Sequence, residues 1–430
     1  MLCAAGTRVR LLVEYLIPRN KYMERLKMCD ITIKQSNAPV ETPTPVHAEA
    51  HAHNAGAGLA TNGATNDGNP GANSGADQNE VARTNLRRLS HDDLIYQLKL
   101  MHLPSFRAKQ IEDWLWHYNI GSFDDMTNIS KALRAQLAKQ FYLYAPRAIN
   151  KQVSQDGSRK YLLLLEDGIS VECVGMPNGD KLSVCVSSQA GCAIGCVFCA
   201  TGKAGLRRNL FADEIYQQAL FIRDDFDGMR ISNIVLMGQG EPLTNYTQAL
   251  RALRLFNNPL GLGIGARHLT LSTCGIIPNI AKFAQEEEQF TLAVSLHSAV
   301  QKTRDHLMPG VKKFSLVNLY NMMQTYVQKT KRRPSYEYAL IKGVNDTPEE
   351  LQALCDFCRG TLCHVNLIQL NEIDDSPFKP TSEKRAQEFV RALNACGVEA
   401  TIRVSRGQDI DAACGQLQQR SCPLNKQKRS

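Results

Sequence analysis

The chain has 430 residues, a hydrophobic content of 43%, a charged content of 21% and a formal net charge of +8. This length allows two or three domains, and no apolar run approaches the ~18 residues that span a membrane. The 14 cysteines, without a secretory signal, indicate a reducing, cytoplasmic compartment. The positive charge favours a polyanionic partner such as nucleic acid, with a solvated basic face as the alternative.

The N-terminal part is predicted to be disordered. Residues 36–82 are rich in Ala, Gly, Asn, Thr and Pro and contain no aromatic residue, so they offer little to a core. Residues 1–84 are therefore expected to form a low-complexity tail, in which a transit peptide and a later start at Met28 both stay open. A small helical accessory domain is expected over 85–146. Its predicted helices are Asp92–Lys99, Phe106–Tyr118 and Ser130–Phe141.

Strand patterns follow. Residues 147–180 are expected to form a β-hairpin extension that turns at 166–168. From 181 to 405 short apolar strands alternate with helical stretches, which predicts a parallel sheet with right-handed crossovers. The fold class is therefore α/β, interpreted as a partial barrel of six β/α units. The predicted barrel strands are Ser183–Ser187, Asn233–Met237, His268–Ser272, Thr291–Ser295, Tyr336–Ile341 and Val365–Leu370.

Three cysteines with the spacing C-x3-C-x2-C follow the first barrel strand: Cys192, Cys196 and Cys199. A structural zinc site closes its shell with four ligands, and a cubane iron–sulfur cluster normally takes four thiolates. Three thiolates leave one iron open for another ligand, and this motif resembles the signature of the radical S-adenosylmethionine (SAM) superfamily. A zinc site with Cys185 as the fourth ligand is the alternative. Cys355 and Cys358 form a further C-x2-C, interpreted as buried helix-face residues before a metal site.

Polar or glycine-rich residues follow several later barrel strands. Active sites gather at the carboxyl ends of such strands, so these residues are expected to meet at one mouth. Glu241 in this set has a carboxylate that accepts from an ammonium group. The four segments are Met237–Pro242, Leu271–Gly275, Val294–Ser298 and Gln369–Glu372.

Two further features are a run of basic residues and a cysteine near the C-terminus. Between Lys302 and Arg333 there are eight Lys or Arg residues and one acid, Asp305, which indicates either a nucleic-acid-binding face or a solvated basic face. Residues 406–430 are expected to form a C-terminal loop and basic tail. Cys414 lies there between small residues and is read either as an acceptor thiol or as a small hydrophobic residue.

Taken together, four motifs resemble the RlmN/Cfr family of radical SAM RNA adenine methyltransferases over about residues 86–420. They are the cysteine motif, Met-Gly-Gln-Gly-Glu-Pro at 237–242, Ser-Leu-His at 295–297 and Asp-Ile-Asp-Ala-Ala-Cys-Gly-Gln-Leu at 409–417. The resemblance implies a radical SAM partial barrel with an N-terminal accessory domain. It also implies methylation of adenine C2 in 23S rRNA, at the peptidyl-transferase centre, and in tRNAs, 3′ of the anticodon.

The resemblance assigns the site residues as well. Cys192, Cys196 and Cys199 would hold a [4Fe-4S] cluster. Cys414 would carry a methyl group, Cys185 would be the second catalytic cysteine, and Glu172 the proton acceptor. SAM would contact Gly240, Glu241, Ser272, Ser295, Leu296, His297 and Asn371.

The implied chemistry explains two thiols outside the cluster. Carbon 2 of adenine is electron-poor and does not attack a methyl sulfonium, whereas a carbon radical adds to it. The radical would form on the Cys414 methyl group, Glu172 would remove the C2 proton, and Cys185 would attack the sulfur of Cys414, leaving a transient disulfide. The implied partners are the RNAs and an electron donor such as flavodoxin or ferredoxin, for a monomeric enzyme without a membrane. The alternatives are a Cfr-type enzyme acting at C8 and a zinc-stabilised RNA-binding protein without catalysis.

Overall fold

A ten-stranded sheet organises the protein, in the order β14-β13-β12-β11-β10-β9-β6-β5-β4-β3. The computed structural model describes residues 83–371, 376–403, 406–407, 409–410 and 417. Residues 1–82 of the predicted N-terminal tail and the predicted site residue Cys414 therefore lie outside the described residues. From β6 to β14 neighbouring strands pair in parallel. These strands are β6 (Lys181–Cys185), β9 (Ile231–Leu236), β10 (Leu269–Thr273), β11 (Thr291–Ser295), β12 (Ser335–Leu340), β13 (His364–Gln369) and β14 (Ala400–Arg403).

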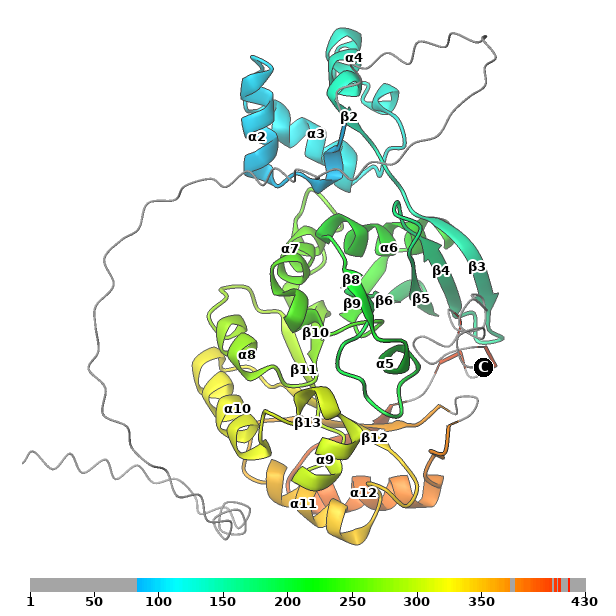
Figure 1. Ribbon diagram of the computed structural model, residues 1–430, viewed down its shortest axis with the longest axis vertical. Coiled ribbons are helices and arrows are strands. Elements are labelled where there is room, and N and C mark those ends of the chain that lie inside the picture. Colours follow the sequence, from blue (N-terminus) through cyan, green and yellow to red (C-terminus); the bar gives the residue numbers. More distant parts are fainter. Residues whose placement is uncertain (1–82, 372–375, 404–405, 408, 411–416, 418–430) are drawn as a thin grey trace, which may run out of the picture. The chain divides into compact units, whose positions relative to one another are not determined.

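The prediction of a radical SAM-type partial barrel is confirmed, and all six predicted strands are present in order. β14 extends the parallel sheet beyond these six by pairing with β13. Strands buried on both faces need long apolar runs, and β12 has five consecutive buried residues after Ser335. Helices line the outside of the curved sheet (Figure 1). They are α6 (Ala212–Asp225), α7 (Tyr246–Asn257), α8 (Ile277–Phe283), α10 (Leu316–Thr330), α11 (Pro348–Cys358) and α12 (Glu383–Ala395).

The predicted hairpin is larger than expected and belongs to the same sheet. β3 (Arg147–Val153), β4 (Arg159–Leu164) and β5 (Ser170–Asn178) pair antiparallel in sequence. β5 runs on to Asn178 and turns back into β6, and the two strands pair antiparallel. These strands therefore continue the barrel sheet at the β6 edge instead of forming a separate hairpin.

The N-terminal helices are α2 (His91–Leu100), α3 (Arg107–Trp116) and α4 (Lys131–Gln140). Ser90 caps α2 in a reciprocal capping box with Asp93, the start signal visible in the sequence. The hydroxyl of Tyr216 on α6 donates to the carbonyl of Trp116 at 2.9 Å, and the helices share one core with the barrel. None of the described helices has the length and apolarity needed to cross a bilayer.

Candidate active site

The cysteine loop is held by backbone contacts at both ends. It follows β7 (Gln189–Gly191), which pairs with β8 (Leu206–Asn209), and it leads into the short helix α5 (Ala200–Ala204). Gly191 has φ +81°, and a Cβ there would lie 1.9 Å from the Gly205 oxygen, so only glycine fits.

A second contact braces the middle of the loop. The amide of Gly310 in η5 (Pro309–Val311) donates to the Ile194 carbonyl at 2.9 Å, and a Cβ on Gly310 would lie 2.5 Å from that oxygen. The segment after α9 (Gln301–Leu307), which the sequence analysis did not predict, therefore presses against the cysteine loop.

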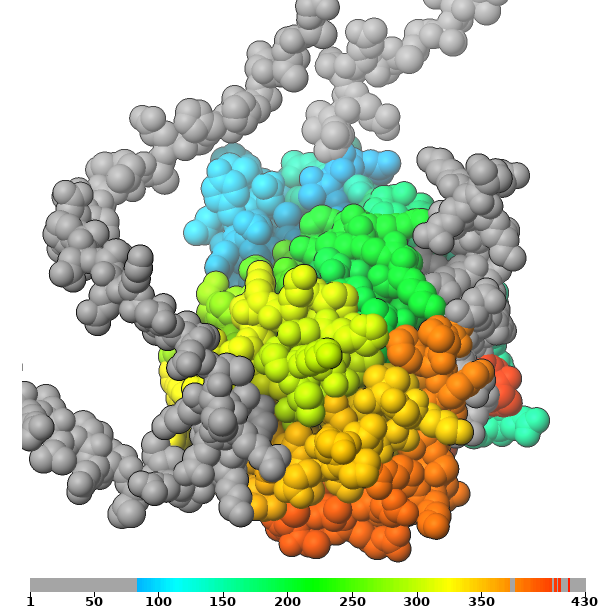
Figure 2. Space-filling model, turned by 60° about the horizontal axis from the view of Figure 1, so that its bottom comes forward, coloured from blue at the N-terminus to red at the C-terminus, as the bar shows by residue number. Residues whose placement is uncertain are grey.

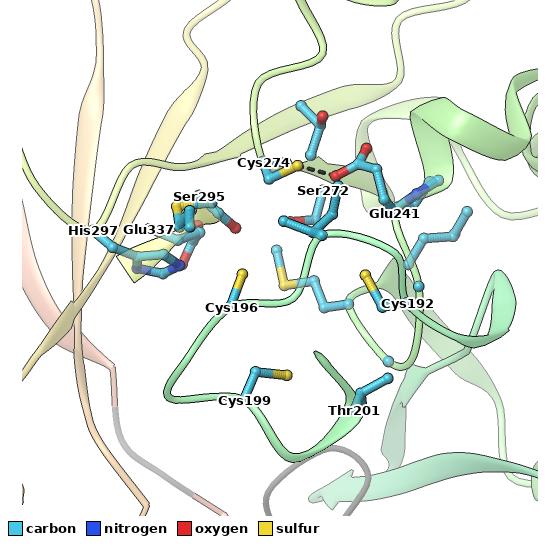
Figure 3. A pocket seen from close by; sticks show the side chains of 18 of the residues that line it. Cys192, Cys196, Cys199, Thr201, Glu241, Ser272, Cys274, Ser295, His297 and Glu337 are labelled. Carbon is cyan, nitrogen blue, oxygen red and sulfur yellow. Dashed lines mark hydrogen bonds between the residues drawn. The ribbon is translucent and has the colours of Figure 1, made fainter. Parts of the chain in front are cut away.

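The three thiols of the loop face a cavity of about 260 Å³ at the carboxyl ends of the strands (Figure 3). Burial raises the pKa of all three, that of Cys192 to about 11, so metal binding must displace protons from them. Among the described residues no group of three or more His, Cys, Asp or Glu is arranged to hold a single metal ion. Three thiols that face one cavity are the donor set that an iron–sulfur cluster takes from a protein when one of its irons is left for another ligand.

Glu241 forms the wall opposite the cysteine loop, at the end of β9. Its carboxylate accepts the amide of Cys274 at 2.7 Å and that of Leu243 at 3.0 Å. Burial raises the pKa of Glu241, and its hydrogen bonds with Cys274 oppose the rise. Gly240, with φ +102°, brings this backbone against Gln189, where a Cβ would lie 2.5 Å from the Gln189 Cβ. The segment thus places Gly240 and the largely buried Glu241 at the wall of the cavity.

His297 closes the other side of the cavity (Figure 3). Its Nδ1 accepts the Ala339 amide at 3.0 Å. Burial lowers its pKa to about 3, helped by the charge of Arg304, so the ring is neutral near pH 7. With Nδ1 occupied as an acceptor, Nε2 carries the proton and serves as a donor.

A second group of side chains lies beside this cavity, on one face of β4, β5 and β6. Lys160 and Cys185 both stand opposite Val174, and Glu172 is the diagonal neighbour on the same face. Lys160 Nζ lies 3.0 Å from Glu172 Oε2, with side-chain exposures of 1% and 2%. The predicted base and the predicted second catalytic cysteine are thus brought together.

Two cations act on the Cys185 thiol. Burial raises its pKa, while the charges of Arg403 and Lys160 lower it. Arg403 also lines the cavity of the cysteine loop, so it connects the two groups of residues. The sequence analysis missed both cations, although a lysine at an inward position of an apolar strand was a usable signal for Lys160.

The predicted SAM contacts divide into two sets. Leu296 is fully buried in the core, and neither it nor Asn371 lines the cavity, so their roles stay predictions. Cys414 lies outside the described residues. Five predicted contacts do line the cavity: Gly240, Glu241, Ser272, Ser295 and His297.

A partial parallel barrel with a three-cysteine loop at its mouth defines a radical SAM enzyme. A family model described as "Radical SAM superfamily" matches residues 186–358. A second family model, "Ribosomal RNA large subunit methyltransferase N-terminal domain", matches residues 84–143. The chain belongs to the RlmN family of radical SAM methyltransferases, and membership implies a [4Fe-4S] cluster and SAM.

Similar proteins support this assignment. The probable dual-specificity RNA methyltransferase RlmN of Clostridium perfringens (strain 13) is 48% identical over 314 residues, covering 73% of this chain and 90% of the relative. The protein of the same name from Bacillus subtilis (strain 168) is 44% identical, covering 73% of this chain and 86% of its own. The crystal structure of a radical SAM methyltransferase from Sphaerobacter thermophilus is 40% identical with a TM-score of 0.73, covering 77% of this chain and 98% of that chain.

Proposed function

We propose that this enzyme methylates carbon 2 of adenine in 23S rRNA and in tRNA through a methylated Cys414. The relatives' name, dual-specificity RNA methyltransferase, supports two kinds of RNA substrate. The observation that carries the proposed reaction is the buried Lys160–Glu172 pair on the same face as Cys185. A base and a thiol side by side are what the removal of a ring proton and the release of a thioether-linked product require.

The cofactors would generate the radical, and residues of the chain would bind and orient the cofactors. When bound, the cluster and SAM supply the electron and the radical that activate the methyl group, with flavodoxin or ferredoxin as the proposed class of electron donor. Cys192, Cys196 and Cys199 would hold the cluster. Gly240, Glu241, Ser272, Ser295 and His297 line the cavity and would orient SAM, with Glu241 accepting from its ammonium group and His297 donating through Nε2.

The release step belongs to Glu172 and Cys185. Glu172 removes the C2 proton, and the Lys160 ammonium, 3.0 Å from its carboxylate, holds that carboxylate in position. The Cys185 thiolate then attacks the sulfur of Cys414 and forms an S–S bond as the S–C bond to the product breaks. The methylene carbon keeps that bonding pair and takes up a proton, which completes the methyl group on the adenine. Arg403 and Lys160 favour the Cys185 thiolate that this attack uses.

Mass spectrometry of RNA tests the proposal. RNA from cells lacking the gene should lose 2-methyladenosine, and the gene should restore it in both rRNA and tRNA. Restored 8-methyladenosine would instead assign the C8 reaction. In vitro, Cys185→Ala should trap RNA covalently through Cys414 as a denaturation-resistant band that nuclease removes. Normal turnover of Cys185→Ala without this band would overturn the two-thiol route.

A further inference from the structure

Four cysteines gather at a corner that the proposed function does not use. Cys355 and Cys358 stand one turn apart at the end of α11, Cys363 directly precedes β13, and Cys396 caps α12. All four are free thiols. α11 and α12 adjoin, and their gold and orange surfaces meet in Figure 2.

The turn after α11 brings Cys358 and Cys363 into contact. Gly360 takes the left-handed conformation with φ +73°, and the Thr361 amide donates to the Cys358 carbonyl at 3.0 Å. The Cys358 thiol then hydrogen-bonds to the Cys363 sulfur. The Thr361 hydroxyl lies 3.2 Å from the same sulfur as a second donor.

These donors make the two thiols unequal. The hydrogen bond from Cys358 lowers the pKa of Cys363, and Thr361 and the charge of Arg333 add to this against burial. The pKa of Cys358 is raised well above its usual value, first by its hydrogen bond to Cys363 and then by burial. Two thiols in contact, with extra hydrogen-bond donors on one sulfur, form the arrangement from which a disulfide can arise.

Cys355 and Cys396 form a second, neighbouring pair. The Cys355 thiol hydrogen-bonds to Cys396, and Arg359 Nη2 lies 3.5 Å from the Cys396 sulfur. This pair joins two helices instead of closing one turn. It is the natural internal comparison for Cys358 and Cys363.

We propose that Cys358 and Cys363 form a redox-active dithiol that hydrogen peroxide oxidises to a reversible disulfide. The proposal rests on the contact between the two thiols and on the two donors to the Cys363 sulfur. Cys363 is 7% exposed and Cys358 is fully buried, so the oxidant must be as small as hydrogen peroxide. It concerns residues outside the proposed methyl-transfer route and does not depend on that route.

The oxidation has two steps. The Cys363 thiolate attacks one peroxide oxygen, the O–O bond breaks, and the departing hydroxide takes a proton to become water, leaving a sulfenic acid on Cys363. The Cys358 sulfur then attacks the Cys363 sulfur, an S–S bond forms, and the hydroxyl leaves with the Cys358 proton as a second water. Two thiols are oxidised by two electrons and one peroxide is reduced to two waters.

Peptide mapping of the holoenzyme tests this directly. Trypsin cuts after Lys342, Arg359 and Arg391, so Cys363 falls on a different peptide from Cys358. After titration with hydrogen peroxide and alkylation of free thiols, we expect peptide 343–359 linked to the peptide that begins at Gly360, with fragmentation placing the bond at Cys358. Dithiothreitol should separate the two peptides.

Two serine variants separate the roles. Cys358→Ser should abolish the link and leave a sulfenic acid on Cys363 that dimedone labels, whereas the matched control Cys355→Ser should keep the link. A map of the parent protein in which 343–359 joins only 392–403, through Cys355 and Cys396, would contradict the proposal. So would overoxidation of Cys363 without any link, and these two results need no variant to fold.

Discussion

The charges of Lys160 and Glu172 depend on each other because water reaches neither side chain. Removing one member of a buried ion pair takes away the opposite charge that stabilises the other, which costs about 3–5 kcal/mol, whereas replacing both is often near neutral. We therefore expect Lys160→Met to lower the free energy of unfolding in urea by about 3–5 kcal/mol, and Lys160→Met/Glu172→Gln to recover most of it. Glu172→Gln completes the comparison: if the effects of Lys160→Met and Glu172→Gln simply add in the double variant, the charges are not coupled.

His297 gives a pH dependence with a definite sign. Its folded pKa is about 3 and the usual value is 6.5, so the unfolded chain binds the proton first as the pH falls. Stability that His297 contributes is present above pH 6.5 and is lost progressively down to pH 3. Between pH 7.5 and pH 5 the parent protein should lose about 2 kcal/mol more than His297→Asn.

Asparagine is the matched replacement at this site. Its side-chain oxygen offers an acceptor to Ala339, and asparagine tolerates the left-handed backbone that His297 adopts at φ +54°. Urea unfolding at the two pH values measures the difference. Equal slopes for the two proteins would show that His297 titrates near its ordinary pKa in the folded state.

Single residues also show which features could be predicted from the sequence and which could not. The cysteine motif and the cap at Ser90 were predictable because each depends on neighbours within a few positions. The partner of Glu172 was not, because Lys160 meets it only through the register of β4 against β5. Arg304 shows the same limit, since it stands in the basic run but is 1% exposed and donates to the Cys274 carbonyl at 2.6 Å.

At the scale of elements, α10 divides the basic run that the sequence presents as continuous. Lys312 and Lys313 are exposed just after η5, which contacts the cysteine loop. Lys329 and Lys331 lie at the other end of α10, a helix of 15 residues that spans about 22 Å. The sequence shows that basic residues are concentrated in this segment. Because α10 separates the two pairs of lysines, they do not form one basic patch.

This division predicts unequal effects on RNA binding, given the proposed RNA substrate. Lys312→Glu/Lys313→Glu should weaken RNA binding and reduce the slope of log affinity against log salt by roughly 1–2, because two phosphate contacts are lost near the site mouth. The matched control Lys329→Glu/Lys331→Glu should change the slope less. Fluorescence anisotropy over a salt series measures both, and a larger effect of the control would move the RNA path to the far end of α10.

At the scale of the whole chain, the β3–β4 turn holds residues from near the C-terminus. Asp156 accepts the Gly407 amide at 3.0 Å, and Asp409 accepts the Gln155 amide at 2.9 Å and the Ser154 hydroxyl. No local pattern joins positions about 250 apart, so this contact could not be predicted from the sequence. It fixes the chain five residues before Cys414.

Loss of this contact should therefore affect methyl transfer and spare the cofactor site. Asp156→Ala/Asp409→Ala frees the segment that leads to Cys414, and misplacement of a reacting group by about 1 Å costs up to 100-fold in rate, so we expect transfer to RNA to fall roughly 10- to 100-fold. Iron content and RNA-independent SAM cleavage should stay at the parent level, because neither carboxylate lines the cavity of the cysteine loop. Asp180→Ala, an exposed carboxylate in the neighbouring β5–β6 turn, is the matched control. Loss of iron together with transfer would mean that the contact supports the fold as a whole, and unchanged transfer would mean that Cys414 reaches the site without it.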